Sequence, residues 1–258
     1  MFDLLKLRKS HGYQAIPDIL KATLPEPFRG FPLLNNALCS ENCQACVHIC
    51  PTHAISTRPL KMDLGACIFC GECAQICPTQ AIRFSSAYCL GSTQRTDLIV
   101  SSGLKASDYE KTAIQVRKKI KQYFGKSLKL RQVSAGGCSG CELELNASNN
   151  VNFDMSRFGI DFVASPRHAD GLVITGPITE NMAPALHDTW VSIASPRLVI
   201  TVGACAISGG LFTQSEAVNR TFFDKIPVDL YIPGCPTHPL TFIHAVLAFL
   251  GQKKPAKS

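Results

Sequence analysis

Eight cysteines between residues 39 and 77 stand in two copies of one short pattern. The stretch CQACVHICPTHAI, from Cys43, recurs as CGECAQICPTQAI, from Cys70, at an offset of 27 residues. The second copy contains the run C-x2-C-x2-C-x3-C-P, formed by Cys67, Cys70, Cys73 and Cys77 with Pro78. In such a run three closely spaced thiolates hold one 4Fe-4S cube, and the fourth holds the neighbouring cube. Two copies therefore predict two cubes with crossed ligation.

The first copy departs from this pattern at its leading position. Ser40 occupies the place of the first thiol, and Cys39 lies one residue earlier. A hydroxyl is a far poorer iron ligand than a thiolate, so we assign Cys39 and expect a local bulge that brings it in. The predicted ligands of cluster 1, called set 1, are Cys39, Cys43, Cys46 and Cys77. The predicted ligands of cluster 2, called set 2, are Cys67, Cys70, Cys73 and Cys50.

Zinc is the alternative occupant of these eight thiols, because it also favours C-x2-C pairs in tetrahedral sets. Both copies, however, end in Cys-Pro-Thr-x-Ala-Ile. Eight thiolates in a duplicated run of this kind favour iron and sulfide.

Four more cysteines are scattered along the C-terminal half. Cys138 and Cys141 lie in GGCSGCELE, after the β-rich run LKLRQVS. Cys205 and Cys235 follow the β-rich runs RLVITVG and VDLYIPG. In an open parallel sheet the loops that leave the carboxyl ends of the strands gather at one edge. We therefore expect these four thiolates (set 3) to hold a third 4Fe-4S cube, cluster 3. A structural zinc ion and unrelated buried cysteines are the alternatives.

Few other residues offer site chemistry. Cys89, the remaining cysteine, is expected to be buried as a small apolar side chain. Glu142 and Glu144 adjoin set 3, where a carboxylate could tune a cluster or pass a proton, or be an ordinary first-turn helix charge. The sequence has no Ser-His-Asp set, Walker loop or G-x-G-x-x-G fingerprint, so no catalytic residue is predicted. Three histidines are expected to pack or to hydrogen-bond: His48, His53 and His238.

Composition bounds the class of protein. The chain has 258 residues, enough for two units, with 46% hydrophobic and 17% charged residues. Its 13 cysteines are an odd number, and MFDLLKLRKS does not resemble a secretory signal. We therefore expect reduced thiols in a cytoplasmic compartment. The longest apolar run, LTFIHAVLAFLG, is too short to span a membrane.

The net charge of +7 comes from one segment, because nine Lys or Arg residues lie between Leu104 and Arg131 against only Asp108 and Glu110. Such a segment could suit nucleic acid, an anionic membrane surface or an acidic partner. No aromatic or Gly-rich nucleic-acid motif accompanies it, so we expect a solvated helix face and no nucleic-acid partner.

Four segments follow from these patterns. Residues 1–35, rich in Pro and turn signals, predict an extended arm, and residues 36–95 an α+β, ferredoxin-like domain with two clusters. Residues 105–126 predict one amphipathic linker helix, with a capping box at Ser107 and Glu110. Residues 127–258 alternate strand-like and helix-like runs, which is typical of an α/β, doubly wound, mostly parallel sheet of the flavodoxin-like kind.

Residues 136–236 resemble the small subunit of membrane-bound nickel-iron hydrogenases and the related cluster-bearing 20 kDa subunit of respiratory complex I. The motifs that carry the resemblance are GGCSGCELE, ADGLVITGPITENM, VITVGACAISGG and PGCP. In that superfamily the four cysteines hold the 4Fe-4S cluster nearest the active site or the quinone pocket. The complex I subunit has adjacent cysteines in the first motif, whereas this chain has C-x2-C, as hydrogenase small subunits do. By the same resemblance, Glu144 matches an acidic residue with a role in proton or electron transfer.

Residues 28–84 resemble a second kind of protein, the two-cluster ferredoxin subunit of formate hydrogenlyase and its relatives. FRGFP and LGACIFCGECAQICPTQAI carry this resemblance. The two parts are normally separate polypeptides, and here they are fused in one chain.

Together the resemblances imply an electron-transfer subunit of a membrane-associated nickel-iron hydrogenase, similar to formate hydrogenlyase. Three 4Fe-4S clusters would relay electrons to or from the nickel-iron centre of a separate large subunit, so the chain alone would be inactive. The implied partners are that large subunit, membrane-embedded subunits and a donor such as a formate dehydrogenase or a ferredoxin. The implied location is the cytoplasmic face of the cell membrane. The alternatives are a complex I-like module that delivers electrons to quinone and a zinc-stabilised adaptor.

Overall fold

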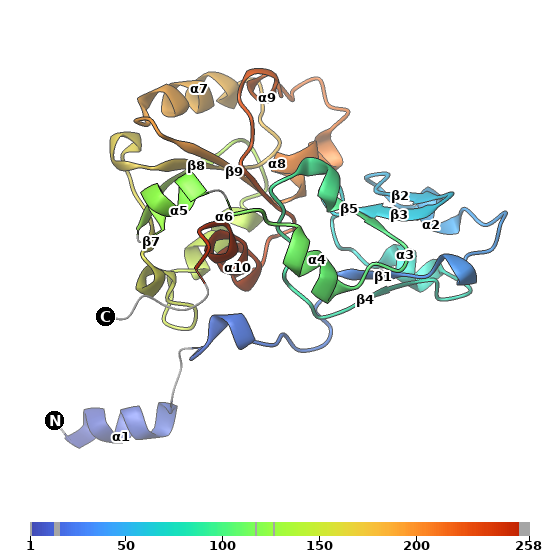
Figure 1. Ribbon diagram of the computed structural model, residues 1–258, viewed down its shortest axis with the longest axis horizontal. Coiled ribbons are helices and arrows are strands. Elements are labelled where there is room, and N and C mark those ends of the chain that lie inside the picture. Colours follow the sequence, from blue (N-terminus) through green and yellow to red (C-terminus); the bar gives the residue numbers. More distant parts are fainter. Residues whose placement is uncertain (1, 13–15, 117, 126, 253–258) are drawn as a thin grey trace.

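The computed structural model in Figure 1 describes residues 2–12, 16–116, 118–125 and 127–252. A cysteine-rich domain made of short antiparallel strands lies beside an α/β domain built on a five-stranded parallel sheet (Figure 1). The fold class expected from the sequence is confirmed.

Five short strands frame the cysteine-rich domain. A two-stranded antiparallel sheet pairs β1 (Pro32–Leu34) with β4 (Ile82–Phe84). A three-stranded antiparallel sheet has β3 at its centre, between β2 and β5. Its strands are β2 (Ile55–Thr57), β3 (Leu60–Asp63) and β5 (Ile99–Ser101).

Each cysteine repeat contributes one short helix, α2 (Ala45–Ile49) or α3 (Glu72–Ile76). Both helices end at the cysteine that precedes a proline, Cys50 in the first repeat and Cys77 in the second. The residue before a proline is disfavoured in helical geometry, which explains why the two helices stop at equivalent positions. The sequence repeat is therefore also a repeat of local structure.

The core of this domain includes cysteines as well as apolar side chains. Leu60 and Met62 alternate inward on β3 and are fully buried. Cys46, Cys67 and Cys73 are buried in the same cluster. Side chains from outside the repeats complete the core, namely Phe31, Leu98, Val100, Tyr109 and Ala113.

The α/β domain has five parallel strands in the order β10-β9-β8-β6-β7. Numbered within the domain this is the order 2-1-3-4-5 of a flavodoxin-like, doubly wound sheet. The central strands β8 and β9 are buried along their whole length, as expected of parallel strands covered on both faces. The strands are β6 (Leu128–Ser134), β7 (Ile160–Phe162), β8 (Gly171–Thr175), β9 (Leu198–Val202) and β10 (Leu230–Ile232).

Helices cover both faces of this sheet (Figure 1). On one face lie α6 (Gly140–Ala147) and α10 (Pro239–Phe249), which contribute Leu145 and Phe242 to one apolar cluster. On the other face lie α7 (Met182–Ser192) and α9 (Phe222–Lys225) with a second cluster. The short helix α8 (Ala204–Ser208) follows β9 directly. Six 3-10 helices complete the described elements: Ile19–Lys21, Asn36–Leu38, Arg95–Leu98, Met155–Phe158, Pro166–His168 and Gly210–Phe212.

The linker contains two short helices, α4 (Ala106–Thr112) and α5 (Lys118–Phe124), where the sequence pattern predicts one. The helix stops at Ala113, because the carbonyl oxygen of Ala113 accepts hydrogen bonds from the Thr93 amide at 3.0 Å and the Ser92 hydroxyl at 2.9 Å. These tertiary bonds take the place of the next helical ones. Residues 117 and 126 of the predicted linker lie outside the described residues.

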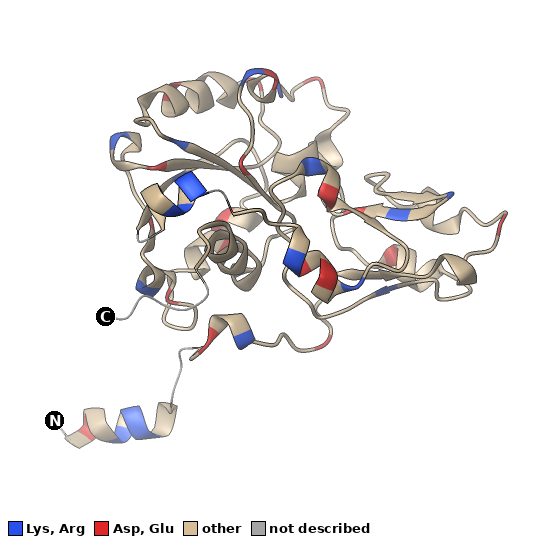
Figure 2. Ribbon diagram, viewed as in Figure 1, with Lys and Arg blue, Asp and Glu red and all other residues tan. Residues whose placement is uncertain are grey.

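Three of the basic residues of this segment lie on α5. Lys118, Lys119 and Lys121 are exposed, while Ile120 and Phe124 pack against the α/β domain. Figure 2 shows the Lys and Arg positions on α5 and on the N-terminal helix α1 (Phe2–His11).

The N-terminal segment, predicted to be extended, carries helix α1, in which no residue is buried. The segment from Ile16 to Phe28 packs against the α/β domain, and the Ile16 amide donates to the Asn152 carbonyl at 2.8 Å. Residues 1 and 13–15 of this segment, and residues 253–258 of the last, lie outside the described residues. Among the helices described, none has both the length and the apolar character needed to cross a membrane.

Candidate iron-sulfur sites

The four thiols of set 1 line one small cavity, together with the apolar side chains of Leu60 and Ile82. Cys39 ends a 3-10 helix and Cys46 lies in α2, whereas Cys77 comes from the other repeat, at the end of α3. Burial raises the pKa of the Cys46 thiol, and repulsion from the other three thiolates of the set raises it further. Ser40 also lines the cavity, so the structure brings both candidate leading residues to the same place.

The thiols of set 2 also lie together. Burial raises the pKa of Cys67 and of Cys73 to about 12, and repulsion from Cys70 and Cys50 adds to both shifts. Cys50 reaches this set from the first repeat. Cys77 and Cys50 thus each lie with the thiols of the other repeat, whereas the crossed ligation of iron stays a prediction.

The two crossing cysteines have equivalent hydrogen-bond donors. The Ala54 amide donates to Cys50 Sγ at 3.3 Å, and the Ala81 amide donates to Cys77 Sγ at 3.2 Å. The hydroxyl groups of Thr52 and Thr79 lie 3.7 Å from the same two sulfur atoms. At Cys77 burial acts to raise the pKa, but hydrogen bonds from Thr79 and from backbone amides outweigh it, so the pKa is lowered. These donors favour the thiolate, the form that binds iron.

Set 3 lies at the carboxyl edge of the parallel sheet. Cys138 and Cys141 follow β6, Cys205 follows β9, and Cys235 follows β10. Burial raises the pKa of Cys141 to about 12 and that of Cys205 to about 11, and Cys235 contributes repulsion to both. Strand β6 borders β8 at the point where the strand order reverses, which is where doubly wound sheets form their sites. Cys138 and Cys235 are exposed, so this set opens to the surface.

Gly203 makes the approach of two loops in set 3 possible. A Cβ atom at this position would lie 2.5 Å from Cys141 Sγ, closer than real contacts allow. Its backbone also has φ of 88°, in the region that favours glycine. No side chain larger than hydrogen fits between β9 and the thiol of Cys141.

The three sets are neighbours in the order 1, 2, 3. Among the influences that raise the pKa of Cys73, in set 2, is repulsion from Cys46 of set 1. Among those that raise the pKa of Cys235, in set 3, is repulsion from Cys70 of set 2. Both effects require the thiols to lie near one another. Set 2 therefore lies near both set 1 and set 3.

Residues of the FRGFP segment lie between sets 2 and 3. A cavity there is lined by Phe28, Arg29 and Phe69 on one side and by Cys235 and Pro236 on the other. Arg29 Nε donates to the Phe69 carbonyl at 2.6 Å, which holds the Cys67–Cys70 loop in place. In the sequence this segment stands out only by its resemblance to ferredoxin subunits, and the structure gives it a positioning contact.

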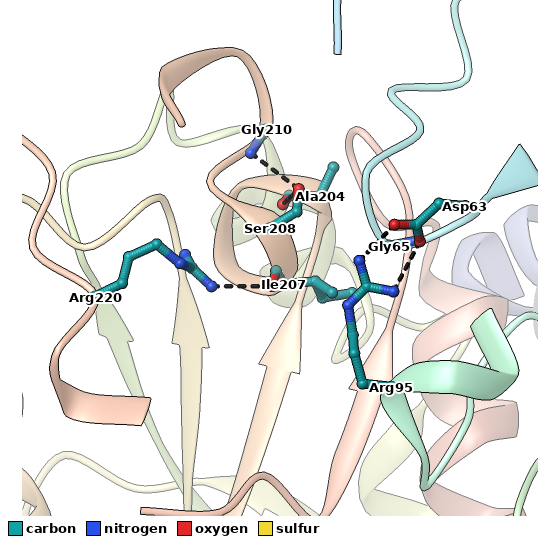
Figure 3. Close-up of polar contacts among 8 residues, drawn as sticks. All are labelled: Asp63, Gly65, Arg95, Ala204, Ile207, Ser208, Gly210 and Arg220. Atoms are coloured by element: carbon teal, nitrogen blue, oxygen red, sulfur yellow. Dashed lines mark hydrogen bonds and ion pairs between the residues drawn. The ribbon is translucent and has the colours of Figure 1, made fainter. Parts of the chain in front are cut away.

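Two arginines lie on either side of α8, the helix that carries Cys205, and each makes its hydrogen bonds within its own domain (Figure 3). Arg220 donates to three carbonyl oxygens of the α8 region, those of Cys205, Ala206 and Ile207, at 3.2, 2.9 and 2.9 Å. Arg95 binds the Asp63 carboxylate through two hydrogen bonds, of 2.8 and 2.5 Å.

Ile207 of α8 packs close to Gly65 on the cysteine-rich side, since a Cβ on Gly65 would lie 2.7 Å from Ile207 Cγ2. Figure 3 places Arg95, Asp63 and Gly65 beside α8, with Arg220 on its other side. Sequence patterns gave no signal for the bonds of Arg95 to Asp63 and of Arg220 to the α8 carbonyls, because they join residues far apart in the chain.

The two carboxylates near set 3 differ in their surroundings. Glu142 Oε1 accepts a hydrogen bond from the Thr175 hydroxyl at 2.6 Å, and its charge raises the pKa of Cys141 and of Cys205. Glu144 is half-buried, and burial raises its pKa. The structure therefore places Glu142 beside the thiols, whereas the role of Glu144 in proton or electron transfer stays a prediction.

Cys89 belongs to none of the three sets. It is partly buried and packs against an apolar cluster, as the sequence predicted, but it also lies beside the polar side chains of Glu110 and His244.

Thiol groups of this number and grouping fit iron-sulfur clusters. Each set offers four sulfur donors, and backbone amides point at sulfur atoms in set 1 (Cys77) and set 2 (Cys50 and Cys67). Such amide-to-sulfur bonds are typical of protein-bound iron-sulfur centres. The cysteine-rich domain and the doubly wound sheet thus define an iron-sulfur subunit of the oxidoreductase class.

Comparison with known protein families supports the assignment to iron-sulfur oxidoreductase subunits. Residues 138–249 match the family described as NADH ubiquinone oxidoreductase, 20 Kd subunit, and residues 60–83 match the 4Fe-4S binding domain. A probable membrane-bound hydrogenase subunit, mbhJ, from Pyrococcus furiosus is 36% identical over 55% of this chain and 86% of its own length. The chain belongs to this 20 Kd subunit family, which also contains hydrogenase subunits, and it carries a 4Fe-4S binding region ahead of the family domain.

Other relatives include a formate hydrogenlyase subunit and an NADH-quinone oxidoreductase subunit. Formate hydrogenlyase subunit 7 from Escherichia coli is 44% identical over 52% of this chain, which spans about half (51%) of that relative's length. NADH-quinone oxidoreductase subunit 6 from Thermus thermophilus is 40% identical over 46% of this chain and 64% of its own length. A solved chain of the membrane-bound sulfane sulfur reductase, an archaeal respiratory complex, aligns with a TM-score of 0.42 and 29% identity over 52% of this chain and 71% of that chain.

Proposed function

We propose that this chain is the iron-sulfur electron-transfer subunit of a membrane-associated nickel-iron hydrogenase, similar to formate hydrogenlyase. The observation that carries the proposal is the series of three four-thiol sets, adjacent in the order 1, 2, 3 and open to the surface at set 3. One-electron transfer is the chemistry that 4Fe-4S clusters supply when bound. A series of sites within one chain suits carriage of electrons across it.

The chain's own residues hold and tune these sites. Sets 1, 2 and 3 each provide four thiolates for one 4Fe-4S cluster. The amides of Ala54 and Ala81 stabilise negative charge on Cys50 and Cys77. Arg29 fixes the Cys67–Cys70 loop of set 2, and Arg220 fixes α8, the helix that carries Cys205. Each of these contacts helps to hold the thiols of the three sets in position.

The exposure of Cys138 and Cys235 supports a large partner subunit over set 3. Buried clusters lose electrons only to partners that come close, so an open set is suited to face the next electron carrier. The three sets use every C-x2-C pair of this chain, and Cys89 is the one cysteine left over, so no pair of thiols remains for nickel. The nickel-iron centre is therefore proposed to lie on a separate large subunit, as in hydrogenases.

Membrane association is supported by the relatives, because mbhJ is named as a subunit of a membrane-bound hydrogenase. The chain would lie on the cytoplasmic face, attached through membrane-embedded subunits. An electron donor such as a formate dehydrogenase or a ferredoxin would deliver electrons near sets 1 and 2.

A complex I-like module that reduces quinone is the second candidate, since relatives of that kind are equally similar. The gap of two residues between Cys138 and Cys141 favours hydrogenase, because the complex I subunit has adjacent cysteines at this motif. This gap lets Cys138 lie in the loop after β6 while Cys141 lies in the first turn of α6.

Anaerobic purification of the chain from its native membranes, with its partners attached, tests the proposal. We expect about twelve iron atoms per copy of this chain, four per set, beyond the iron that the partner subunits hold, and a copurifying subunit that contains nickel. Hydrogen evolution should accompany the nickel. A quinone-reactive partner without nickel would support the second candidate instead, and zinc in place of iron would contradict both and support the adaptor.

A further inference from the structure

Three metal-ligating side chains meet at a place that none of the iron-sulfur sets uses. Cys89, Glu110 and His244 each direct a donor atom toward the others, and the three atoms all lie within 4.8 Å of one another. His244 Nε2 is 3.1 Å from Glu110 Oε1.

The three residues come from three separate parts of the molecule. Cys89 lies in the segment between β4 and β5, Glu110 lies in α4 of the linker, and His244 lies in α10 of the α/β domain. The chain folds these segments together although more than a hundred residues separate Glu110 from His244. The cluster therefore joins the cysteine-rich half of the chain to the α/β domain.

His244 is a buried polar residue in an otherwise apolar helix. Helix α10 is apolar, and it buries nearly every residue against the sheet, His244 included. A buried imidazole needs a polar partner to offset its loss of hydration. Its neighbour Tyr88 meets it edge to face, with ring centroids 6.0 Å apart, and directs its own hydroxyl elsewhere, to the Ile19 carbonyl at 2.8 Å. Glu110 and Cys89 are thus the polar groups that face His244.

We propose that Cys89, Glu110 and His244 bind a divalent transition-metal ion, zinc in the first place, that fastens the linker to α10. One thiolate, one imidazole and one carboxylate form a mixed donor set that suits zinc, whereas calcium and magnesium prefer oxygen donors alone. A single thiol does not suit an iron-sulfur cluster, which takes several.

The geometry is close to that of a zinc site. Donor atoms around a tetrahedral zinc ion lie about 3.5 Å apart, as follows from the usual zinc-ligand bond lengths. The trio, within 4.8 Å, reaches this spacing through small rotations of the side chains. Three protein ligands leave a fourth position for water. The Glu110 side chain, 47% exposed, gives the ion a path from solvent.

Burial and the charge of Glu110 raise the pKa of the Cys89 thiol, so the thiol holds its proton in the absence of metal. Burial lowers the pKa of His244, which leaves the imidazole neutral and able to donate its lone pair. Binding then displaces one proton from Cys89 to solvent, and the thiolate and the carboxylate balance the two charges of the ion.

The experiment uses the anaerobically purified complex with its iron intact, treated with a mild chelator and then titrated with cobalt(II) alone. We expect one cobalt ion per copy of this chain beyond the iron. The visible bands of tetrahedral cobalt should appear with a thiolate charge-transfer band. Cys89→Ser should abolish that charge-transfer band, and His244→Asn and Glu110→Gln should each release the ion. Iron content should be unchanged in all three variants.

Tyr88→Phe is the matched control, because it keeps the ring beside His244 and removes only the hydroxyl that bonds to Ile19. This variant should bind cobalt as the unaltered chain does. The proposal is overturned if the unaltered chain binds no ion beyond its iron, or if cobalt persists unchanged in His244→Asn. The iron content of each variant reports on its folding, so a misfolded variant is recognised by its loss of iron. The cobalt titration of the unaltered chain then still tests whether the site binds a metal ion.

Discussion

The two domains assemble their thiols in opposite ways. In the cysteine-rich domain, eight cysteines between residues 39 and 77 form two sets through short helices and tight turns. In the α/β domain, four cysteines from three loops spread over residues 138 to 235 form one set, and the sheet alone brings them together. The first arrangement is encoded by local spacing and the second by topology.

The domains also differ in what stabilises them. Cys46, Cys67 and Cys73 are part of the apolar core of the cysteine-rich domain. In the α/β domain separate apolar clusters cover both faces of the sheet, and its exposed cysteines contribute little to them. A small domain whose metal-binding cysteines form part of its core depends for its stability on the groups that these cysteines bind. A doubly wound sheet is stabilised by an apolar core of its own.

The largest effect should follow removal of iron by an anaerobic chelator. We expect the amides of β2, β3 and β5 to exchange with solvent about 100-fold faster, because the buried thiols lose the groups that hold them. The amides of β6, β8 and β9 should change by less than about threefold. Hydrogen-deuterium exchange with mass spectrometry measures both, and equal deprotection of the two domains would contradict the comparison.

The next effect should come from Gly203→Ala, which tests the dependence of set 3 on the sheet. The added methyl would lie 2.5 Å from Cys141 Sγ, so it should displace that thiol. We expect a loss of about four of the twelve iron atoms, measured by iron analysis, with the spectroscopic signals of the other two clusters retained.

Gly103→Ala is the control for Gly203→Ala. Gly103 has φ of 83°, close to the 88° of Gly203, but nothing lies within 4 Å of a Cβ at that position. Both substitutions place a side chain at a positive φ, which strains any residue other than glycine, and only Gly203→Ala adds a steric contact. Equal loss of iron from the two variants would attribute the effect to strain and remove the proposed role of the close approach.

Much of this contrast could be predicted from the sequence. Strand-like runs that end at Gly or Ser predict the five parallel strands, and the rule for loops at the carboxyl edge predicts that Cys205 and Cys235 approach Cys138. Local spacing likewise predicts which of the other eight thiols group together. These features depend on periodicity and on a general rule of topology, both of which a single sequence displays.

The rest depends on contacts between residues far apart in the chain. The linker pattern predicts one helix, but hydrogen bonds from Ser92 and Thr93 end α4 at Ala113. The position of Glu142 beside the thiols follows from its bond to Thr175, which no sequence spacing reveals. The pairing of Arg95 with Asp63 is equally hidden. Tertiary hydrogen bonds of this kind override local propensity.

A smaller effect should distinguish the two candidates for the leading ligand of set 1. Both Cys39 and Ser40 line the cavity of that set. Cys39→Ala should cost between about one and four iron atoms per chain, because a thiolate is lost, whereas Ser40→Ala should cost none. Iron analysis with electron paramagnetic resonance of the reduced protein measures this. The reverse result would show that the repeat keeps its regular register through Ser40.

The smallest effect should test the crossing of the two repeats. Thr79 and Thr52 place their hydroxyls 3.7 Å from Cys77 Sγ and Cys50 Sγ respectively. A hydroxyl that donates to sulfur stabilises the added charge of a reduced cluster, so its loss should lower the reduction potential. A hydrogen bond contributes about 0.5 to 1.5 kcal/mol, which for one electron corresponds to about 20 to 60 mV.

Thr79→Val and Thr52→Val are matched to each other, since each removes one hydroxyl and keeps the side-chain shape. With crossed ligation, Thr79→Val should lower the potential of cluster 1, which takes Cys43 and Cys46 from the first repeat. Thr52→Val should lower that of cluster 2. Redox titration followed by electron paramagnetic resonance resolves the two clusters. If each substitution instead shifted the cluster held by its own repeat, the ligation would be uncrossed, and the spacing rule would fail in the domain where it should be strongest.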